Sequence, residues 1–427
     1  MGRGWVFAAS LALLCICATA LRAQESQNVV PEGWKATPMP LVGYMSDLGF
    51  IFGATSDFYD YGHNPALFPG YRHRIHAEAS YSTKGRILAR LEHESSFIIP
   101  GIRFSASATA QIDPLYNFYG FNGDVTSYDR SIDRRNGVAY YNYRRSLFNF
   151  RSNFEGDITP RLKWFAGLSF RYCLNEDLNH KNYDSYNTLF HFYRANGIIR
   201  DNELKGGFFE FQGGLAYDSR SSTLSPARGI YADAFMVGAP DILGTGYSYL
   251  KLCAHFRHYI QICPDWLIFA YHLAYQGTVI GEAPFYMQQN IYSTRTDQTY
   301  CEGLGGLNTL RGMMSGRLVG NDYAWANFEI RCRIVSGNVA GMEWYLALNP
   351  FFDIGVIAKP FRTAELASAL GMSEAEISRL ARSFHKSAGL GVKIGLDNSY
   401  MISIEGGKSF NDNDGPFNIS TSINYIF

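Results

Sequence analysis

The last eleven residues of the chain read Phe417-Asn418-Ile419-Ser420-Thr421-Ser422-Ile423-Asn424-Tyr425-Ile426-Phe427. The odd positions are apolar or aromatic apart from one threonine, whereas the even positions from 418 to 424 are all Asn or Ser. Successive side chains of a β-strand point to opposite faces, so this period of two predicts a strand with one apolar and one polar face.

The same alternation recurs upstream. Between 388 and 396 the even positions are Ala, Leu, Val, Ile and Leu, and the odd ones are Gly or Lys. Segments 322–334 and 344–356 alternate in the same way, and the first of them sets Asn327, Glu329, Arg331 and Arg333 against apolar neighbours. Beyond the first two dozen residues, no run approaches the ~20 apolar residues that a membrane-spanning helix needs. The pattern therefore indicates strands.

Alternation alone does not separate a lipid-facing barrel from a secreted, soluble β-protein, because both bury one face of each strand. Three features favour the barrel. The polar faces carry Gly, Ser, Asn and paired charges, short turns alternate with long connections at 178–205 and 282–321, and Tyr and Phe are abundant near strand ends. Outer-membrane barrels have such a polar interior, unequal loops and aromatic girdles. We therefore predict an all-β, transmembrane, antiparallel β-barrel.

The strands can be counted backward from Phe427. Alternation and turn residues predict eleven strands, at 416–427, 400–410, 387–397, 343–357, 322–334, 265–281, 246–262, 228–239, 206–219, 162–175 and 140–157. Five more are expected at 36–45, 49–60, 72–83, 86–97 and 102–112. Sixteen is even, as a barrel with both termini on one side requires. Ser373 to Glu376 reads as a capping box, with apolar residues at helical spacing up to Phe384, and predicts a short helix in an outer loop.

Length and charge exclude several classes of protein. The 427 residues carry 38 Lys+Arg and 38 Asp+Glu, so the chain lacks the positive field that gathers nucleic acid. Aromatic residues make up 15%, too many for a disordered chain. Arg3, an apolar run from Trp5 to Cys17 and small residues up to Ala23 are typical of an export signal. We expect residues 1–23 to be a signal peptide and 24–427 to be the barrel domain.

The sequence shows no pattern for a metal, a cofactor or a catalytic group. Five cysteines lie beyond residue 23 without C-x-x-C spacing, and neither G-x-S-x-G nor H-E-x-x-H occurs. His73 and His76 have no third ligand nearby in the sequence, so we expect no metal there. Lys251, His255 and Arg257 form a basic row on one strand, for which contact with an acidic inner face, a pore lining and ordinary wall charge all stay open.

Several short motifs, in this order and spacing, resemble the outer-membrane assembly superfamily typified by BamA and TamA. Leu310-Arg311-Gly312 resembles the motif of its inward-folded loop, although Met313 stands where an aromatic residue is usual. Phe351, Asp353 and Gly355 match its Phe-x-Asp-x-Gly strand signature. Further similarities lie in Glu329-x-Arg331, in the block Asp218, Arg220, Pro226 and Gly229, and in a terminal strand signal at Tyr425 and Phe427.

The alternation provides an independent check on these motifs. Phe351, Asp353 and Gly355 share the non-lipid face of their strand, and Glu329 lies on the corresponding face of the preceding strand. A guanidinium that the 282–321 connection brings inside could bridge the two carboxylates with its planar fork. We therefore expect Arg311 to pair with Asp353 and with Glu329, and Gly312 to let the loop approach the wall closely. The competing interpretation is that these charges are only solvated or paired across strands.

The resemblance implies a barrel in the outer membrane of a Gram-negative bacterium that inserts or moves proteins or other cargo through a weak seam between its first and last strands. It implies no enzyme activity and no cofactor, and its partners would be outer-membrane lipids, assembly components and client proteins. About 15 residues separate the expected leader from the first predicted strand, so we expect the periplasmic POTRA repeats to be absent and a partner to supply them. The alternatives are a passive pore or structural barrel, and an outer-membrane enzyme with a site on its wall.

Overall fold

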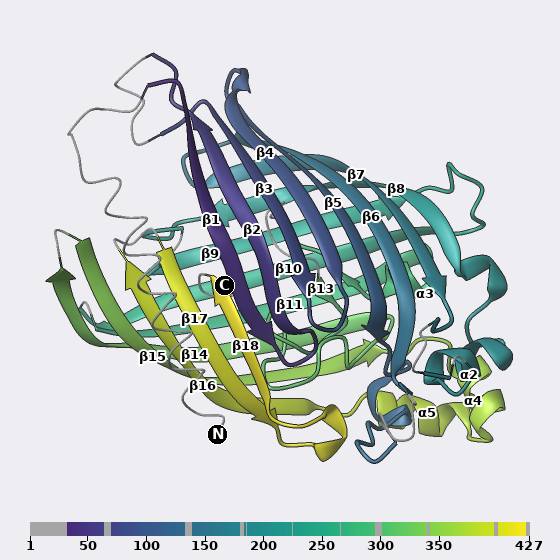
Figure 1. The fold of residues 1–427 in the computed structure, drawn as a ribbon. Helices are drawn as coiled ribbons and strands as arrows, with labels where there is room; N and C mark the ends of the chain where they lie inside the picture. The colour runs from purple at the N-terminus through teal and green to yellow at the C-terminus, as the bar shows by residue number, and fades with distance from the viewer. Residues whose placement is uncertain are drawn as a thin grey trace.

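A computed structural model describes residues 32–63, 70–132, 139–179, 183–184, 186–223, 225–264, 266–294, 301–339, 342–396 and 400–423. Within these residues, sixteen antiparallel strands close into one barrel (Figure 1). They are β1 (Trp34–Met45), β2 (Gly49–Asp60), β3 (His73–Ser82), β4 (Ile87–Ile99), β5 (Ile102–Asn117), β6 (Asn142–Asp157), β7 (Leu162–Glu176), β8 (Lys205–Asp218), β9 (Gly229–Ala239), β10 (Ser248–Cys263), β11 (Leu267–Glu282), β14 (Asp322–Val339), β15 (Met342–Lys359), β16 (His385–Leu396), β17 (Tyr400–Ser409) and β18 (Asn418–Ile423).

Each strand pairs with the next along the chain, except that β11 pairs with β14 and that β1 closes the ring against β18. The connection between β11 and β14 holds a small hairpin of its own, β12 (Asn290–Ile291) and β13 (Cys301–Glu302), after the helical turn α3 (Phe285–Gln288). The other helices are α2 (Leu189–Ala195), α4 (Thr363–Leu370) and α5 (Glu374–Ala381), with single 3₁₀ turns η2 (Gly123–Val125), η3 (Asp201–Glu203) and η4 (Asp412–Asp414).

The two faces of each strand differ as the alternation requires. On β17, Ser403 and Glu405 are buried inside the barrel, whereas Ile402 and Ile404 are exposed on the outside. Many other large apolar side chains are exposed in the same way around the outer surface. A band of exposed apolar side chains suits hydrocarbon and not water. The predicted fold class, a sixteen-stranded transmembrane barrel, is confirmed. None of the helices in the described residues has the length and apolar character to cross a membrane.

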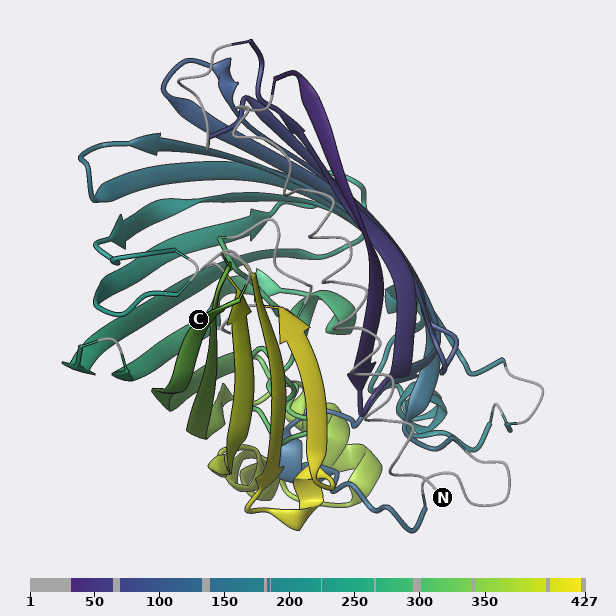
Figure 2. The same cartoon turned by 60° about the vertical axis from the view of Figure 1, so that its left-hand side comes forward.

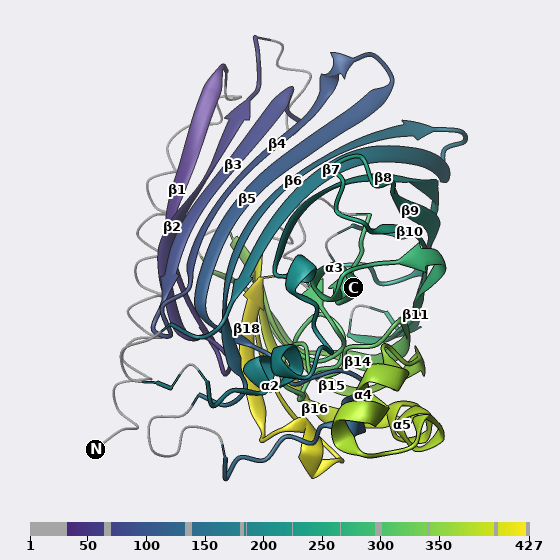
Figure 3. The same ribbon diagram turned by 90° about the vertical axis from the view of Figure 1, so that its right-hand side faces the viewer.

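The long connections gather at one end of the barrel, which we call the capped end. Figure 3 shows α2, α4 and α5 at this end, beside the ends of the strands. Aromatic rings from these connections pack together: Phe118 lies 5.1 Å from Tyr193 between ring centroids, and Phe121 lies 5.1 Å from Phe361. Large apolar side chains from distant segments thus form one buried core over this end.

All sixteen predicted strands occur, but several boundaries differ. β14 runs to Val339 and β15 begins at Met342, so most of the residues between the predicted strands 322–334 and 343–357 are strand as well. Helix α5 begins as predicted, with Ser373 Oγ accepting a hydrogen bond from the Glu376 backbone N–H at 3.2 Å, but α4 and α2 were not predicted. The expected signal peptide, the turn 397–399 and the terminal residues Tyr425 and Phe427 lie outside the described residues.

Candidate functional site

The connection 283–321, which we call the inner loop, is described at 283–294 and 301–321, and these residues fold into the barrel and pack on the inner face of its wall. Its two limbs pair through reciprocal backbone hydrogen bonds between Leu304 and Leu318, both 2.9 Å. The wall holds the loop on both sides. Lys251 Nζ on β10 donates to the carbonyl of Met287 at 2.9 Å, and Arg145 on β6 forms an ion pair with Glu302. The loop is therefore part of the barrel core.

Arg311 lies on the inner loop between two strands of the wall. Its Nε and Nη2 donate to the two oxygens of Asp353 at 2.9 and 2.8 Å, and its backbone N–H also donates to Asp353 at 2.8 Å. Nη1 donates to Glu329 at 2.8 Å. This is the bidentate fork geometry that makes arginine–carboxylate pairs specific and strong. The three side chains are at most 2% exposed, so water does not screen the pairing.

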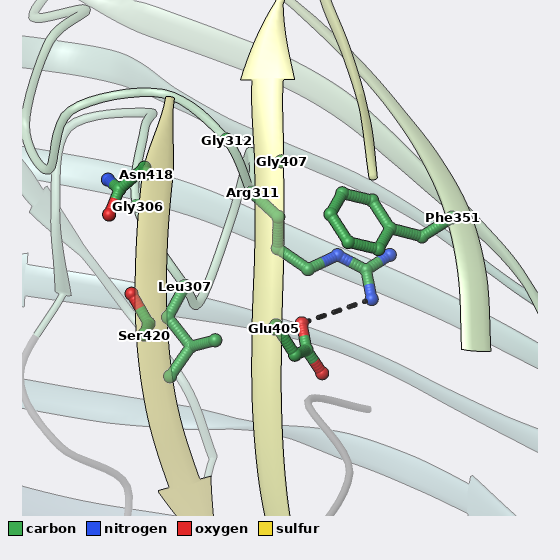
Figure 4. Close-up of a pocket in the computed structure, with 9 residues that line it drawn as sticks. All are labelled: Gly306, Leu307, Arg311, Gly312, Phe351, Glu405, Gly407, Asn418 and Ser420. Atoms are coloured by element: carbon green, nitrogen blue, oxygen red, sulfur yellow. Dashed lines mark ion pairs between the residues drawn. The ribbon is translucent and has the colours of Figure 1, made fainter. Parts of the chain in front are cut away.

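A third carboxylate completes the arrangement. Figure 4 shows Glu405 of β17 pointing toward the guanidinium, at 3.6 Å from Nη1, with the Phe351 ring beside it. The guanidinium carbon lies 4.0 Å from the centroid of Phe351, close enough for a cation–π contact. Three cations face three carboxylates here, so the buried charges balance; the cations are Arg311, Arg331 and Lys393.

Two glycines let the loop reach the wall. Gly312 has φ of +79°, and a Cβ there would lie 2.6 Å from the backbone nitrogen of Lys408 on β17. A Cβ on Gly355 would lie 2.7 Å from Leu310 Cδ1, so Leu310 packs directly over the glycine. Met313, which replaces the aromatic residue of the motif, is fully buried among Leu304, Leu310 and other apolar side chains. An unbranched methionine fills this space without a ring.

The structure brings together all the residues that the sequence analysis selected for the loop and the wall. It places Leu310, Arg311 and Gly312 on the loop against Phe351, Asp353, Gly355 and Glu329. Glu405 and Lys393, which join the same charge network, were missed. Strand parity could have found both, because each occupies an inward position of a predicted strand.

The remaining selected residues lie elsewhere. Asp218 and Arg220 form a bidentate pair at the β8–β9 turn, with Nη2 donating to Oδ2 at 2.8 Å. The three residues of the basic row are buried on β10, and none of them lines an open pore within the described residues: Lys251 binds loop carbonyls, His255 lies 3.1 Å from the ring of His272, and Arg257 stacks on Tyr231. His73 contacts His93, and His76 contacts Asp57.

Within the described residues, which end at Ile423, the seam between β1 and β18 is short. Its register comprises Met45 opposite Ser420, and side-chain hydroxyls supply several of its hydrogen bonds. Thr421 Oγ1 accepts from the Tyr44 N–H at 3.0 Å, and Ser46 Oγ accepts from the Ile419 N–H at 3.0 Å. In Figure 2, β18 (yellow) and β1 (purple) approach at one end and diverge toward the other. A strand pair with few ladder bonds is easier to separate than its neighbours.

The inner loop contacts both sides of this seam. The Ser315 N–H donates to Asp47 Oδ2 in the β1–β2 turn at 3.1 Å. On the other side, Asn418 Nδ2 of β18 donates to the carbonyl of Met313 at 2.8 Å. Beside this contact, a small pocket lies between the loop tip and β17–β18 (Figure 4), and Glu405 Oε2 and Asn418 Oδ1 accept no hydrogen bond there within the described residues.

The fold and the site together define a class of protein. It is a membrane barrel with a short closing seam and an inner loop that an arginine anchors to the wall. The chain matches the Omp85 superfamily domain over residues 73–415 and therefore belongs to that superfamily. The motifs resemble the outer-membrane assembly superfamily, which is the same group of barrels as the Omp85 superfamily. The predicted resemblance is therefore confirmed.

Two solved structures show the same fold. One is BamA from Haemophilus ducreyi lacking POTRA domains 1–3, with 13% identity, TM-score 0.58, and 92% of this chain matched to 70% of that one. The other is CdiB from Escherichia coli, with 10% identity, TM-score 0.56, and 92% of this chain matched to 64% of that one. This chain thus spans about two thirds of the length of these two chains. Among curated proteins, none matches its sequence.

Proposed function

We propose that this chain is an outer-membrane barrel of a Gram-negative bacterium that inserts or translocates polypeptides through the seam between β1 and β18. The observation that carries the proposal is that the inner loop contacts both edges of a short seam while Arg311 anchors the same loop to the wall. In the part of β18 that the structure describes, few bonds hold it to β1, so an incoming strand could compete for either edge. Strand addition at such an edge needs no catalytic residue and no cofactor.

Membership of the Omp85 superfamily and the shared fold with BamA and CdiB support this proposal. The described residues comprise the barrel and its connections and include no POTRA repeat. In our proposal, a partner supplies the periplasmic domain that receives clients. Lipids of the outer membrane and unfolded client proteins are the other expected partners.

A disulfide across the seam tests the proposal. Met45→Cys and Ser420→Cys introduce thiols at the register pair of β1 and β18. The purified barrel is placed in lipid vesicles with a urea-unfolded β-barrel client, and folding of the client is followed by its altered mobility on gels. We expect the reduced protein to accelerate client folding, and the oxidised protein to lose the acceleration and regain it with reductant.

The matched control is a disulfide between β2 and β3. Ile51→Cys and Ser82→Cys form a register pair of the neighbouring strands, so they add a cross-link without closing the seam. This variant should accelerate folding whether oxidised or reduced. If the oxidised seam variant worked as well as the control, opening of the seam would have no part in the function.

The alternative function is a passive pore, which the water-accessible charges on the inner faces of β2, β3 and β4 favour. Arg74, for example, pairs with Asp57 while its side chain stays 24% exposed. A pore would conduct steadily in a planar bilayer, and Arg311→Ala would leave its conductance unchanged. An assembly barrel should conduct little until the same substitution releases the inner loop.

A further inference from the structure

A second polar cluster lies at the capped end, apart from Arg311. Asp124 comes from η2 in the β5–β6 connection, Ser383 from the connection between α5 and β16, His385 from the first position of β16, and Asp414 from η4 in the β17–β18 connection. His385 and Asp414 are buried, whereas the Asp124 side chain keeps 16% of its surface exposed. Three connections that are distant in the sequence therefore meet at one partly accessible point.

The donor atoms of this cluster are spaced as ligands of one ion would be. His385 Nε2 lies 3.1 Å from Ser383 Oγ and 3.9 Å from Asp124 Oδ2, and the two oxygens lie 2.7 Å apart. Tetrahedral ligands at about 2.0–2.2 Å from a common zinc ion lie roughly 3.3–3.6 Å apart, a value between the shortest and longest of these separations, so an entering ion replaces the Ser383–Asp124 hydrogen bond and moves the two oxygens apart by about 0.6 Å. The set offers an imidazole nitrogen, a carboxylate oxygen and a hydroxyl oxygen, and leaves other coordination positions for water.

The groups behind these donors have the arrangement of a metal site's outer shell. The other ring nitrogen of His385, Nδ1, lies 2.9 Å from both oxygens of Asp414, which orients the ring and leaves Nε2 as the ligand atom. Asn411 Nδ2 donates to the second oxygen of Asp124 at 3.0 Å, and Ser409 Oγ donates to Asp414 at 2.7 Å. A carboxylate behind a metal-binding histidine is the usual second-shell partner.

The charges also favour a cation. Two carboxylates, Asp124 and Asp414, meet one permanent cation in the described ion pairs: Arg317, whose Nε lies 3.7 Å from Asp414. In these ion pairs the two carboxylates outnumber the one permanent cation, which suits a bound cation. Gly123 lies beside this nitrogen, since a Cβ there would lie 3.3 Å from Nε2.

We propose that Asp124, Ser383 and His385 bind a divalent transition-metal cation of the Zn²⁺ type, with Asp414 as the orienting second-shell group. Mixed nitrogen and oxygen donors suit such ions. Bound there, the cation ties the β5–β6 connection to β16 and, through Asp414 and Asn411, to the β17–β18 connection. It thereby stabilises the capped end beside the β18 edge of the seam.

The same residues also resemble a Ser-His-Asp triad, which would make the site a hydrolase. Ser383 Oγ is, however, 2.7 Å from the Asp124 carboxylate. A hydroxyl that donates its proton to a carboxylate is not directed at the imidazole that should remove it. The pairing therefore favours the metal site.

Direct binding tests the proposal on the full barrel in detergent after dialysis against a chelator. Co²⁺ serves as a spectroscopic substitute for Zn²⁺, and calorimetry follows Zn²⁺ itself. We expect one equivalent to bind, a visible Co²⁺ band, and a higher unfolding temperature with Zn²⁺ than with chelator. Asp124→Asn and His385→Gln should abolish the band, and Asp414→Asn should weaken binding about tenfold or more.

The control is His93→Gln, which removes a ring from the lumenal pair His73–His93 and should leave the stoichiometry at this site unchanged. Gel mobility of unheated samples shows whether each variant is folded. If the folded wild-type chain binds no Co²⁺ or Zn²⁺, or if folded Asp124→Asn binds as wild type does, the proposal is wrong. A Co²⁺ band that disappears only in His93→Gln would likewise place the metal in the lumen and overturn it.

Discussion

The two halves of the barrel wall carry the same kind of ion pair in different surroundings. On β14 and β15, Arg311 pairs with Glu329 and Asp353, and all three side chains are at most 2% exposed. On β3 and β4, Glu78 pairs with Arg90 at 2.7 Å, but these side chains are 14% and 18% exposed. The inner loop covers the first wall and leaves the second in contact with water.

This difference shows where the barrel holds its loop. An ion pair in water contributes little, because solvent screens it and either partner can be solvated alone. A buried pair is different, since removal of one partner leaves the other as an uncompensated buried charge. The wall at β14–β17 therefore anchors the loop, whereas the charges on β2–β4 only keep the lumen polar.

The largest effect is expected from Arg311→Ala. The substitution leaves the carboxylates of Asp353, Glu329 and Glu405 without their shared partner, and should lower the free energy of unfolding by about 3 to 5 kcal/mol. Urea unfolding of the barrel in lipid, followed by tryptophan fluorescence, measures this loss. An unchanged midpoint would mean that water reaches the pair and that the two walls do not differ.

Next in size is Ile394→Arg, which probes the outer face of the anchoring wall. Ile394 is on the outward side of β16, so the new charge would enter hydrocarbon and cost about 2 to 4 kcal/mol. Thr55→Arg on the inner face of β2 is the control and should cost less than about 1 kcal/mol, because its charge can reach lumenal water. Equal costs in the same unfolding assay would show that the faces are misassigned.

A smaller loss is expected from Gly312→Ala. The new Cβ would meet the backbone of β17 at 2.6 Å and would hold φ at +79°, so the loop has to move away from the wall at a cost of about 1 to 3 kcal/mol. Gly316→Ala, at φ of +70° and with its nearest contact at 3.2 Å, tests strain with little clash and should cost about 1 kcal/mol. If close contact with the wall adds to the backbone strain, Gly312→Ala will be less stable than Gly316→Ala.

The smallest effect is expected from Arg90→Ala on the water-accessible wall. Its pairs with Glu78 and Glu92 keep 10% to 18% of each side chain exposed, unlike the Arg311 pairs, and the loss should stay below about 1 kcal/mol. Raising the salt concentration should reduce it further, whereas the effect of Arg311→Ala should change little. A loss as large as that of Arg311→Ala would show that this wall is as dry as the other.

The sequence predicts the barrel well because the same alternation of apolar and polar residues recurs in strand after strand. Each strand has to present one apolar face, so a period of two marks the wall even where propensity is weak, and the motif around Arg311 points to Asp353 and Glu329. The sequence does not reveal contacts between residues that lie far apart in the chain. Asp124 approaches His385 and Asp414 only after the connections fold over the capped end, and no spacing of nearby residues in the sequence predicts that contact.

Helix α4 shows a second limit. Its apolar residues are mostly alanines, and only Leu366 is buried in the core that other connections supply, so no strong apolar stripe marks the helix in the sequence. Strand ends are uncertain for a related reason. Ser336, Gly337 and Asn338, for example, fit a turn as well as the end of a strand that extends beyond the membrane. Local sequence therefore determined the existence of the strands better than their lengths.

The most direct test of the account is hydrogen exchange at the backbone amides of the inner loop, measured by mass spectrometry on the barrel in lipid. If Arg311 holds the loop in a dry core, amides of segment 304–318 will exchange about as slowly as those of β15 and will lose this protection in Arg311→Ala. Exchange of the same amides in the wild-type chain as fast as in the short turn at 158–161 would contradict a loop folded against the wall.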